Sequence, residues 1–119
     1  KGQDDYLAVF GEEEIIKAIE PDFNKLSQLD SRGLIITAPG EEVDFVSRFF
    51  APQSGVNEDP VTGSAYTLMI PYWHGILGKK KFSAKQLSFR SGDVECELLE
   101  SRVLIGGKTA RYLEGEILI

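Results

Sequence analysis

The feature that most constrains the fold of this chain is a long apolar segment, Ser64–Leu77, near the middle of its 119 residues. Large or apolar side chains recur in it at helical spacings: Ala65, Leu68, Met69, Tyr72, Trp73 and Ile76. Because these positions cover nearly the whole circumference of a helix, they predict a buried helix rather than one on the surface. Pro71 lies inside the segment and is expected to kink the helix or to end its regular part. A helix without a polar face must be enclosed by the rest of the fold.

Strand-like segments on both sides of this helix can enclose it. They are Asp5–Phe10, Gly33–Thr37, Val43–Phe50, Phe82–Phe89, Val94–Leu99, Arg102–Ile105 and Arg111–Ile119. Alternation within Val43–Phe50 predicts a strand with one strongly apolar face. Two short helices are expected after the first strand, one over about Glu12–Ile19 and one restarting at Pro21. We therefore expect an α+β fold of one domain, residues 1–119, in which a curved, barrel-like sheet wraps around a central helix at about residues 64–77.

Charge and composition argue against several classes of function. The net charge of −6 argues against nucleic-acid binding, which needs clustered Lys and Arg. No segment approaches the roughly 18 apolar residues of a membrane span, so no membrane association is expected. The single cysteine, Cys96, excludes a disulfide within the chain and favours a reducing, cytoplasmic compartment. We interpret Cys96 as a small buried strand residue and His74 as a core or rim residue, and one residue of each type leaves no metal site of the usual kind.

The loop Ala51–Gly63 is long for a compact domain, and long loops of this kind are usually functional. Pro60 pushes Asp59 into an extended conformation and so directs its carboxylate. Thr62 is expected to cap the following helix. The backbone N–H groups near Gly63 and Ser64 begin that helix and are free to bind an anion such as a carboxylate or an enolate oxygen.

These residues suggest a proton-transfer site, with Asp59 as an acid or base beside an anion-binding helix start. The same spacing is also typical of a Pro-stiffened turn followed by a capped helix, which has no catalytic role. Spacing alone leaves both interpretations open.

Motifs in the same order resemble the phenazine-biosynthesis (PhzF-like) isomerase family. They are Arg48-Phe49-Phe50-Ala51-Pro52, Gly55, Glu58-Asp59-Pro60-Val61-Thr62-Gly63-Ser64-Ala65, Pro71-Tyr72-Trp73, Gln86-x-Ser88-x-Arg90 and Gly115-Glu116-Ile117. The resemblance covers essentially the whole chain. One departure is Arg90-Ser91-Gly92, where the family often has Arg-Gly-Gly.

The resemblance implies a diaminopimelate epimerase-like fold and a position as the C-terminal half of a two-domain isomerase. Such an enzyme moves a proton on a small carboxylate-bearing metabolite without a cofactor, in a cleft between its domains. On this resemblance Asp59 and Ser64 are the catalytic residues of this half, and Glu58, Thr62, Gly63 and Ser64 bind the substrate. The main acid/base, a glutamate, belongs to an N-terminal domain that this chain lacks.

Without that domain we expect the isolated chain to be inactive. The alternative function is a non-catalytic binding or self-associating module, because a severed domain interface exposes apolar side chains around Phe49, Phe50 and Trp73. A homodimer would then replace the lost pairing of domains.

Overall fold

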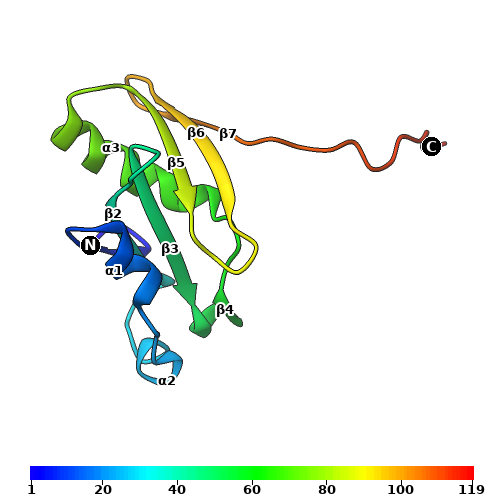
Figure 1. Ribbon diagram of the computed structural model, residues 1–119. Coiled ribbons are helices and arrows are strands. Elements are labelled where there is room, and N and C mark those ends of the chain that lie inside the picture. The colour runs from blue at the N-terminus through cyan, green and yellow to red at the C-terminus, as the bar shows by residue number, and fades with distance from the viewer.

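The computed structural model describes all 119 residues and has the predicted α+β composition (Figure 1). Its strands are β1 (Asp5–Val9), β2 (Gly33–Pro39), β3 (Phe45–Ala51), β4 (Val56–Glu58), β5 (Lys81–Gln86), β6 (Gly92–Leu98) and β7 (Val103–Gly106). Its helices are α1 (Glu13–Ala18), α2 (Phe23–Leu26) and α3 (Tyr66–Leu77), with 3₁₀ turns at Pro52–Ser54 and Gly63–Ala65. No helix is long and apolar enough to cross a membrane.

One mixed sheet contains all the strands, in the order β1-β2-β3-β5-β6-β7, with β4 attached to β3. The pairs β1/β2 and β3/β5 are parallel, and the other pairs are antiparallel. The first half of β3 pairs with β5, whereas Phe50 and Ala51 at its end pair with β4 across an irregularity in register. The segment after β4 therefore runs beside the carboxyl end of β5, and this register places the candidate site.

Both faces of β3 are buried, so the prediction of a single apolar face is wrong. Phe45 and Phe49 belong to a core of 13 buried residues that also contains the buried side chains of α3. Val46 and Phe50 belong to a second core on the opposite face, around Ile16 of α1. A central strand covered on both faces buries consecutive side chains rather than alternate ones.

Helix α3 lies against one face of the sheet (Figure 1) and is not enclosed by it. Tyr66, Met69, Ile70 and Trp73 are buried, but the opposite face of the helix is exposed, with Ile76 at 60%. The prediction of a helix buried all round is therefore wrong, because the sheet is curved but open: its edge strands, β1 and β7, do not pair with each other. The helix also continues through Pro71 to Leu77 instead of ending there.

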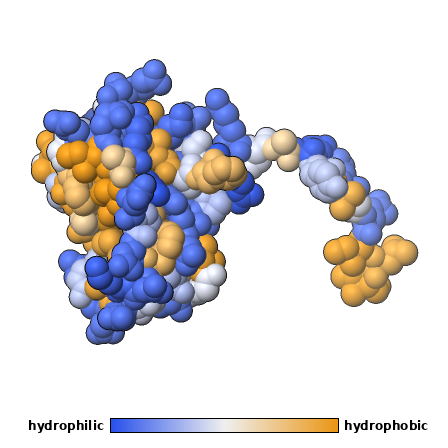
Figure 2. Space-filling view, turned by 60° about the horizontal axis from the view of Figure 1, so that its bottom comes forward, coloured by the Kyte–Doolittle hydropathy of each residue, from blue (hydrophilic) through white to orange (hydrophobic).

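The chain after β7 forms no regular structure, so the strand predicted at Arg111–Ile119 is absent. We call residues 107–119 the C-terminal tail. It projects away from the sheet (Figure 1) and ends in an apolar tip (Figure 2). Exposed side chains in the tail include Tyr112, Leu113, Ile117, Leu118 and Ile119. The tail is apolar as the sequence indicates, but no strand of this chain pairs with it.

Candidate active site

The loop that carries the sequence motif is fixed to the carboxyl end of β5. The Gln86 side chain, only 1% exposed, accepts a hydrogen bond from the Thr62 backbone N–H (2.9 Å) and donates one to the Asp59 carbonyl (2.8 Å). Beyond the end of β5, the Ser88 hydroxyl donates to the Pro60 carbonyl (2.9 Å). A buried amide is costly unless it is hydrogen-bonded, so these bonds make the loop part of the rigid sheet.

Asp59 is held at its backbone and at one side-chain oxygen. Its N–H donates to the Phe49 carbonyl of β3 (3.1 Å), which extends the pairing of β4 with β3 by one bond. The Thr62 hydroxyl donates to Asp59 Oδ2 at 2.5 Å. Asp59 remains partly exposed. The carboxylate is therefore directed by Thr62 as well as by the stiffness of Pro60.

Thr62 occupies the N-cap position of the 3₁₀ turn, but its side chain does not cap the helix. The predicted side-chain cap is wrong because the hydroxyl donates its proton to Asp59 instead. Thr62 is 8% exposed, and both its N–H and its hydroxyl are already hydrogen-bonded. Its predicted role in substrate binding stays a prediction.

Glu58, the last residue of β4, forms a bidentate ion pair with Arg48 of β3, with distances of 2.7 Å to Nε and 3.1 Å to Nη2. Arg48 Nη1 donates to the carbonyls of Ile16 and Ile19 at the end of α1 (3.1 and 2.7 Å). The pair thereby joins α1, β3 and the loop. A substrate that bound the Glu58 carboxylate would compete with Arg48, and the substrate-binding role of Glu58 also stays a prediction.

Gly63 and Ser64 are exposed at the start of the 3₁₀ turn that leads into α3. Neither backbone N–H has a hydrogen-bond partner, and the Ser64 hydroxyl has none either. These three donors lie where the helix dipole favours an anion. Ser64 lines a pocket of about 250 Å³ together with Gly2, Gln3, Asp4, Asp5, Arg32, Thr67 and Leu68. Asp59 does not line this pocket, so the structure brings Asp59 close to Thr62 but not into one cavity with Ser64.

Arg32 is the basic residue of this pocket, and the sequence pattern did not single it out. Its Nε and Nη2 donate to the buried Asp5 carboxylate, and Nη1 has no partner. The hydrogen bonds to Asp5 raise the pKa of Arg32 although burial opposes the shift. No local signal marks Arg32, because only the pairing of β1 with β2 brings it to Asp5, 27 residues away. Arg32 and Ser64 together can offer a carboxylate one charged and one neutral donor, while the carboxylates of Asp4 and Asp5, which line the same pocket, oppose a bound anion.

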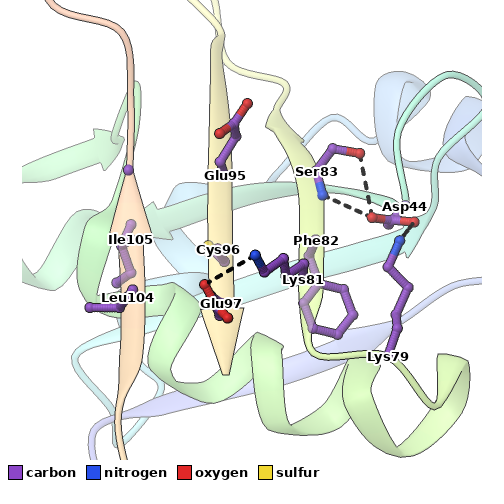
Figure 3. Close-up of a pocket in the computed structure, with 11 residues that line it drawn as sticks. Asp44, Lys79, Lys81, Phe82, Ser83, Glu95, Cys96, Glu97, Leu104 and Ile105 are labelled. Carbon is purple, nitrogen blue, oxygen red and sulfur yellow. Dashed lines mark hydrogen bonds and ion pairs between the residues drawn. The ribbon is translucent and has the colours of Figure 1, made fainter. Parts of the chain in front are cut away.

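A second, larger groove of about 510 Å³ lies on the outer face of β5, β6 and β7 (Figure 3). Its charges are largely paired with one another, as Lys79 with Asp44 (2.7 Å) shows. Cys96 lies beneath it as a buried strand residue, as predicted, and burial raises the pKa of its thiol to about 11. The groove therefore offers no activated nucleophile. His74 is likewise a hydrogen-bonded rim residue, with Nδ1 2.8 Å from the Lys79 carbonyl. No group of three or more His, Cys, Asp or Glu side chains could hold a metal ion.

Comparison with known proteins identifies the family. The family model described as phenazine biosynthesis-like protein (PhzC-PhzF) matches residues 1–115. An uncharacterized isomerase of Pseudomonas aeruginosa is 50% identical over 114 residues, which are 96% of this chain and 44% of that protein. Another, from Halalkalibacterium halodurans, is 43% identical over 97% of this chain and 44% of its own.

The solved structure of a putative phenazine biosynthesis PhzC/PhzF protein from Clostridium difficile superposes with a TM-score of 0.86 and 42% identity. The superposition covers 97% of this chain and 45% of that one, and it confirms the predicted fold. This chain thus spans less than half the length of these relatives. From the family model, the identities and the shared fold we conclude that the chain belongs to the phenazine biosynthesis-like (PhzC/PhzF) protein family.

Proposed function

We propose that this chain is the C-terminal half of a two-domain isomerase that moves a proton on a small carboxylate-bearing metabolite without a cofactor. The observation that carries the proposal is the arrangement of Asp59 through Ser64. A carboxylate is fixed by Thr62, and a few residues later the chain presents the free donors of Gly63 and Ser64. The relatives named as isomerases support this reaction class. The single free, buried Cys96 is compatible with the cytoplasmic compartment expected from the sequence.

In the proposed reaction, the substrate carboxylate binds the N–H groups of Gly63 and Ser64 and the Ser64 hydroxyl, with Arg32 beside them. A base removes a proton from the carbon next to this carboxylate, and the electron pair moves onto the carboxylate as an enolate. The same donors stabilise the enolate because its negative charge is concentrated on the oxygens they face. An acid then returns a proton to a different carbon of the substrate, the far end of a C=C bond conjugated with the enolate, so that this double bond shifts as the new C–H bond forms. Asp59 holds or relays one of these protons, and a glutamate of the N-terminal domain is the main acid/base.

The test uses a two-domain protein in which this chain is joined to the N-terminal half of the 50%-identical Pseudomonas relative. The protein is incubated in D₂O with a panel of small carboxylic acids, and deuterium incorporation is followed by NMR. Asp59→Asn should lower the exchange rate by roughly 100-fold or more, since general acid–base catalysis contributes about 10²–10⁴-fold. Asp30→Asn, an exposed aspartate outside the site, is the matched control. If Asp59→Asn left exchange intact, Asp59 would have no part in the mechanism.

The prediction that apolar side chains around Phe49, Phe50 and Trp73 are exposed is wrong, because all three pack into the cores and are at most 5% exposed. The exposed C-terminal tail instead favours the second candidate function, association with another polypeptide. Its apolar side chains find no partner in this chain, and exposed apolar segments of this kind mark interaction sites. The partner is either the N-terminal domain or a second copy of the chain, which would give a homodimer. Sedimentation at several concentrations, alone and with the separately expressed N-terminal half, decides between them. A strict monomer that binds neither would remove this candidate.

A further inference from the structure

We infer that Gln86 and Thr62 are positioning residues that act as one hydrogen-bonded chain, from amide to hydroxyl to carboxylate, to aim Asp59. The inference rests on the proposed function, in which Asp59 handles a proton. It assigns Thr62 a positioning role instead of substrate binding. It also adds to the site Gln86 of β5, which lies 24 residues after Thr62 in the sequence.

The orientation of the Gln86 amide is fixed by the backbone groups that it meets. The Thr62 N–H only donates, so the Gln86 atom facing it at 2.9 Å is the oxygen Oε1. The Asp59 carbonyl only accepts, so the atom facing it at 2.8 Å is the nitrogen Nε2. The Nε2 group also lies 3.3 Å from the Thr62 hydroxyl oxygen.

This orientation decides where the Thr62 proton goes. Since Gln86 Nε2 donates to the Thr62 hydroxyl oxygen, the single hydroxyl proton is left for Asp59 Oδ2, 2.5 Å away. Asp59 Oδ1 accepts no hydrogen bond within the chain. One oxygen of the carboxylate is thus tied to the sheet through Thr62 and Gln86, while the other has no partner within the chain and is left to exchange a proton.

The burial of Gln86 and Thr62 favours a positioning role over direct contact with the substrate. Gln86 is 1% exposed and Thr62 is 8% exposed, whereas Asp59 is only partly buried. Gln86 also stands at the end of β5, opposite Ser47 of β3 and Gly92 of β6, so its backbone is fixed by the sheet. The central strands of the domain, rather than the loop alone, therefore fix the position of Asp59.

Four variants test the inference. Thr62→Val removes the hydroxyl, and Thr62→Ser restores it. Gln86→Glu keeps the acceptor for the Thr62 N–H but replaces the NH₂ donor, so the Thr62 proton gains a competing acceptor. Gln53→Glu is the matched control, because the exposed Gln53 amide also donates to a backbone carbonyl, that of Ser31, outside the site.

The first readout is the deuterium exchange of the two-domain protein. We expect Thr62→Val and Gln86→Glu to lower kcat by roughly 10- to 100-fold, the range for a lost hydrogen bond to a charged group, with KM changed by less than about 2-fold. Thr62→Ser should restore kcat to within roughly 3-fold, and Gln53→Glu should leave it unchanged. An unchanged kcat for Thr62→Val, a raised KM instead of a lowered kcat, or failure of Thr62→Ser to rescue would each overturn the inference.

The second readout needs no activity and uses the 119-residue chain. The ¹³C shift of the Asp59 carboxyl group should move in Thr62→Val, return in Thr62→Ser and stay unchanged in Gln53→Glu. If Asp59→Asn leaves exchange intact but the carboxyl shift follows this order, the proposed function fails while the hydrogen-bonded chain stands. If the carboxyl shift does not change in Thr62→Val, the hydrogen-bonded series from Gln86 through Thr62 to Asp59 is itself refuted. Should Gln86→Glu fail to fold, the comparison of Thr62→Val with Thr62→Ser still tests the inference.

Discussion

Arg48 should stabilise the domain more than its partner Glu58 does, because it binds three separate groups. Its guanidinium pairs with both Glu58 oxygens, donates to the Ile16 and Ile19 carbonyls and lies over the Phe50 ring at 4.9 Å. The pair is mostly buried, with side-chain exposures of 13% and 21%. Screening by solvent is therefore weak.

The two substitutions remove different parts of this arrangement. Glu58→Gln removes the charge but keeps one oxygen for Arg48, so the loss should be about 1–2 kcal/mol. Arg48→Met removes all four hydrogen bonds, leaves the Glu58 carboxylate unpaired and exposes two carbonyls at the end of α1. Breaking a buried pair from one side costs about 3–5 kcal/mol. With a urea m-value of about 1.5 kcal/mol per molar, the unfolding midpoint should fall by about 2–3 M in Arg48→Met and by about 1 M in Glu58→Gln.

The assay is urea unfolding of the 119-residue chain followed by circular dichroism. Arg111→Met is the matched control, since Arg111 forms only an exposed pair with Glu114 in the tail and should not shift the midpoint. If Arg48→Met leaves no folded population, Arg48→Lys replaces it and should fall between the two variants. Equal losses for Arg48→Met and Glu58→Gln would refute the reasoning, because the bonds to α1 would then contribute nothing. A large rise in KM for Glu58→Gln without loss of stability would instead show that Glu58 binds the substrate.

Three further predictions follow from other parts of the structure. Burial opposes ionisation of Asp44, but hydrogen bonds from Lys79 and Ser83 outweigh it and lower its pKa below the ordinary 3.8. The Asp44 carboxylate therefore contributes its full stabilisation above pH 3.8 and loses it as the pH falls through the lowered pKa of the folded state. Between about pH 4 and pH 2 the urea midpoint should consequently fall less in Asp44→Asn than in the unchanged chain. Burial raises the pKa of Cys96 to about 11, so at pH 8 iodoacetamide should label the native chain roughly 100-fold more slowly than the urea-unfolded chain, and equal rates would contradict this. Removing residues 110–119 should leave the urea midpoint unchanged and abolish binding to the N-terminal half in sedimentation, whereas a lowered midpoint would show that the tail supports this domain.

Local signals in the sequence predict the secondary structure well where the element depends on its own residues. The bounds of β1, α1, β2 and α3 agree with the prediction to within about two residues, because apolar periodicity and flanking glycines and prolines are local. The errors for β3, α3 and residues 111–119 arise from packing and strand pairing rather than from local periodicity. Which faces of β3 and α3 are buried, and whether residues 111–119 pair as a strand, depends on what packs against them.

In the candidate site, too, local features can be predicted from the sequence and contacts between distant residues cannot. The position of the loop and the stiffness imparted by Pro60 are readable in the sequence, since proline acts on its neighbours. The partners that hold the loop are not, because Gln86 and Ser88 come from another strand and its turn. Thr62 shows the consequence: a hydroxyl at an N-cap position predicts a helix cap, but the nearby Asp59 carboxylate is the stronger acceptor and takes the proton.

Under the proposed function, the anchoring of the loop also indicates what an N-terminal half would have to supply. Residues 58–62 are held from β3 through Arg48 and the Phe49 carbonyl, and from β5 through Gln86 and Ser88. All of these contacts lie within this chain, so the orientation of Asp59 does not depend on a second domain. The pocket of Ser64 and Arg32, by contrast, is open, and the donors facing it have no partners. Under the proposed function the N-terminal half therefore adds an acid/base and a wall that excludes water, while the geometry of Asp59 is already set in the isolated chain.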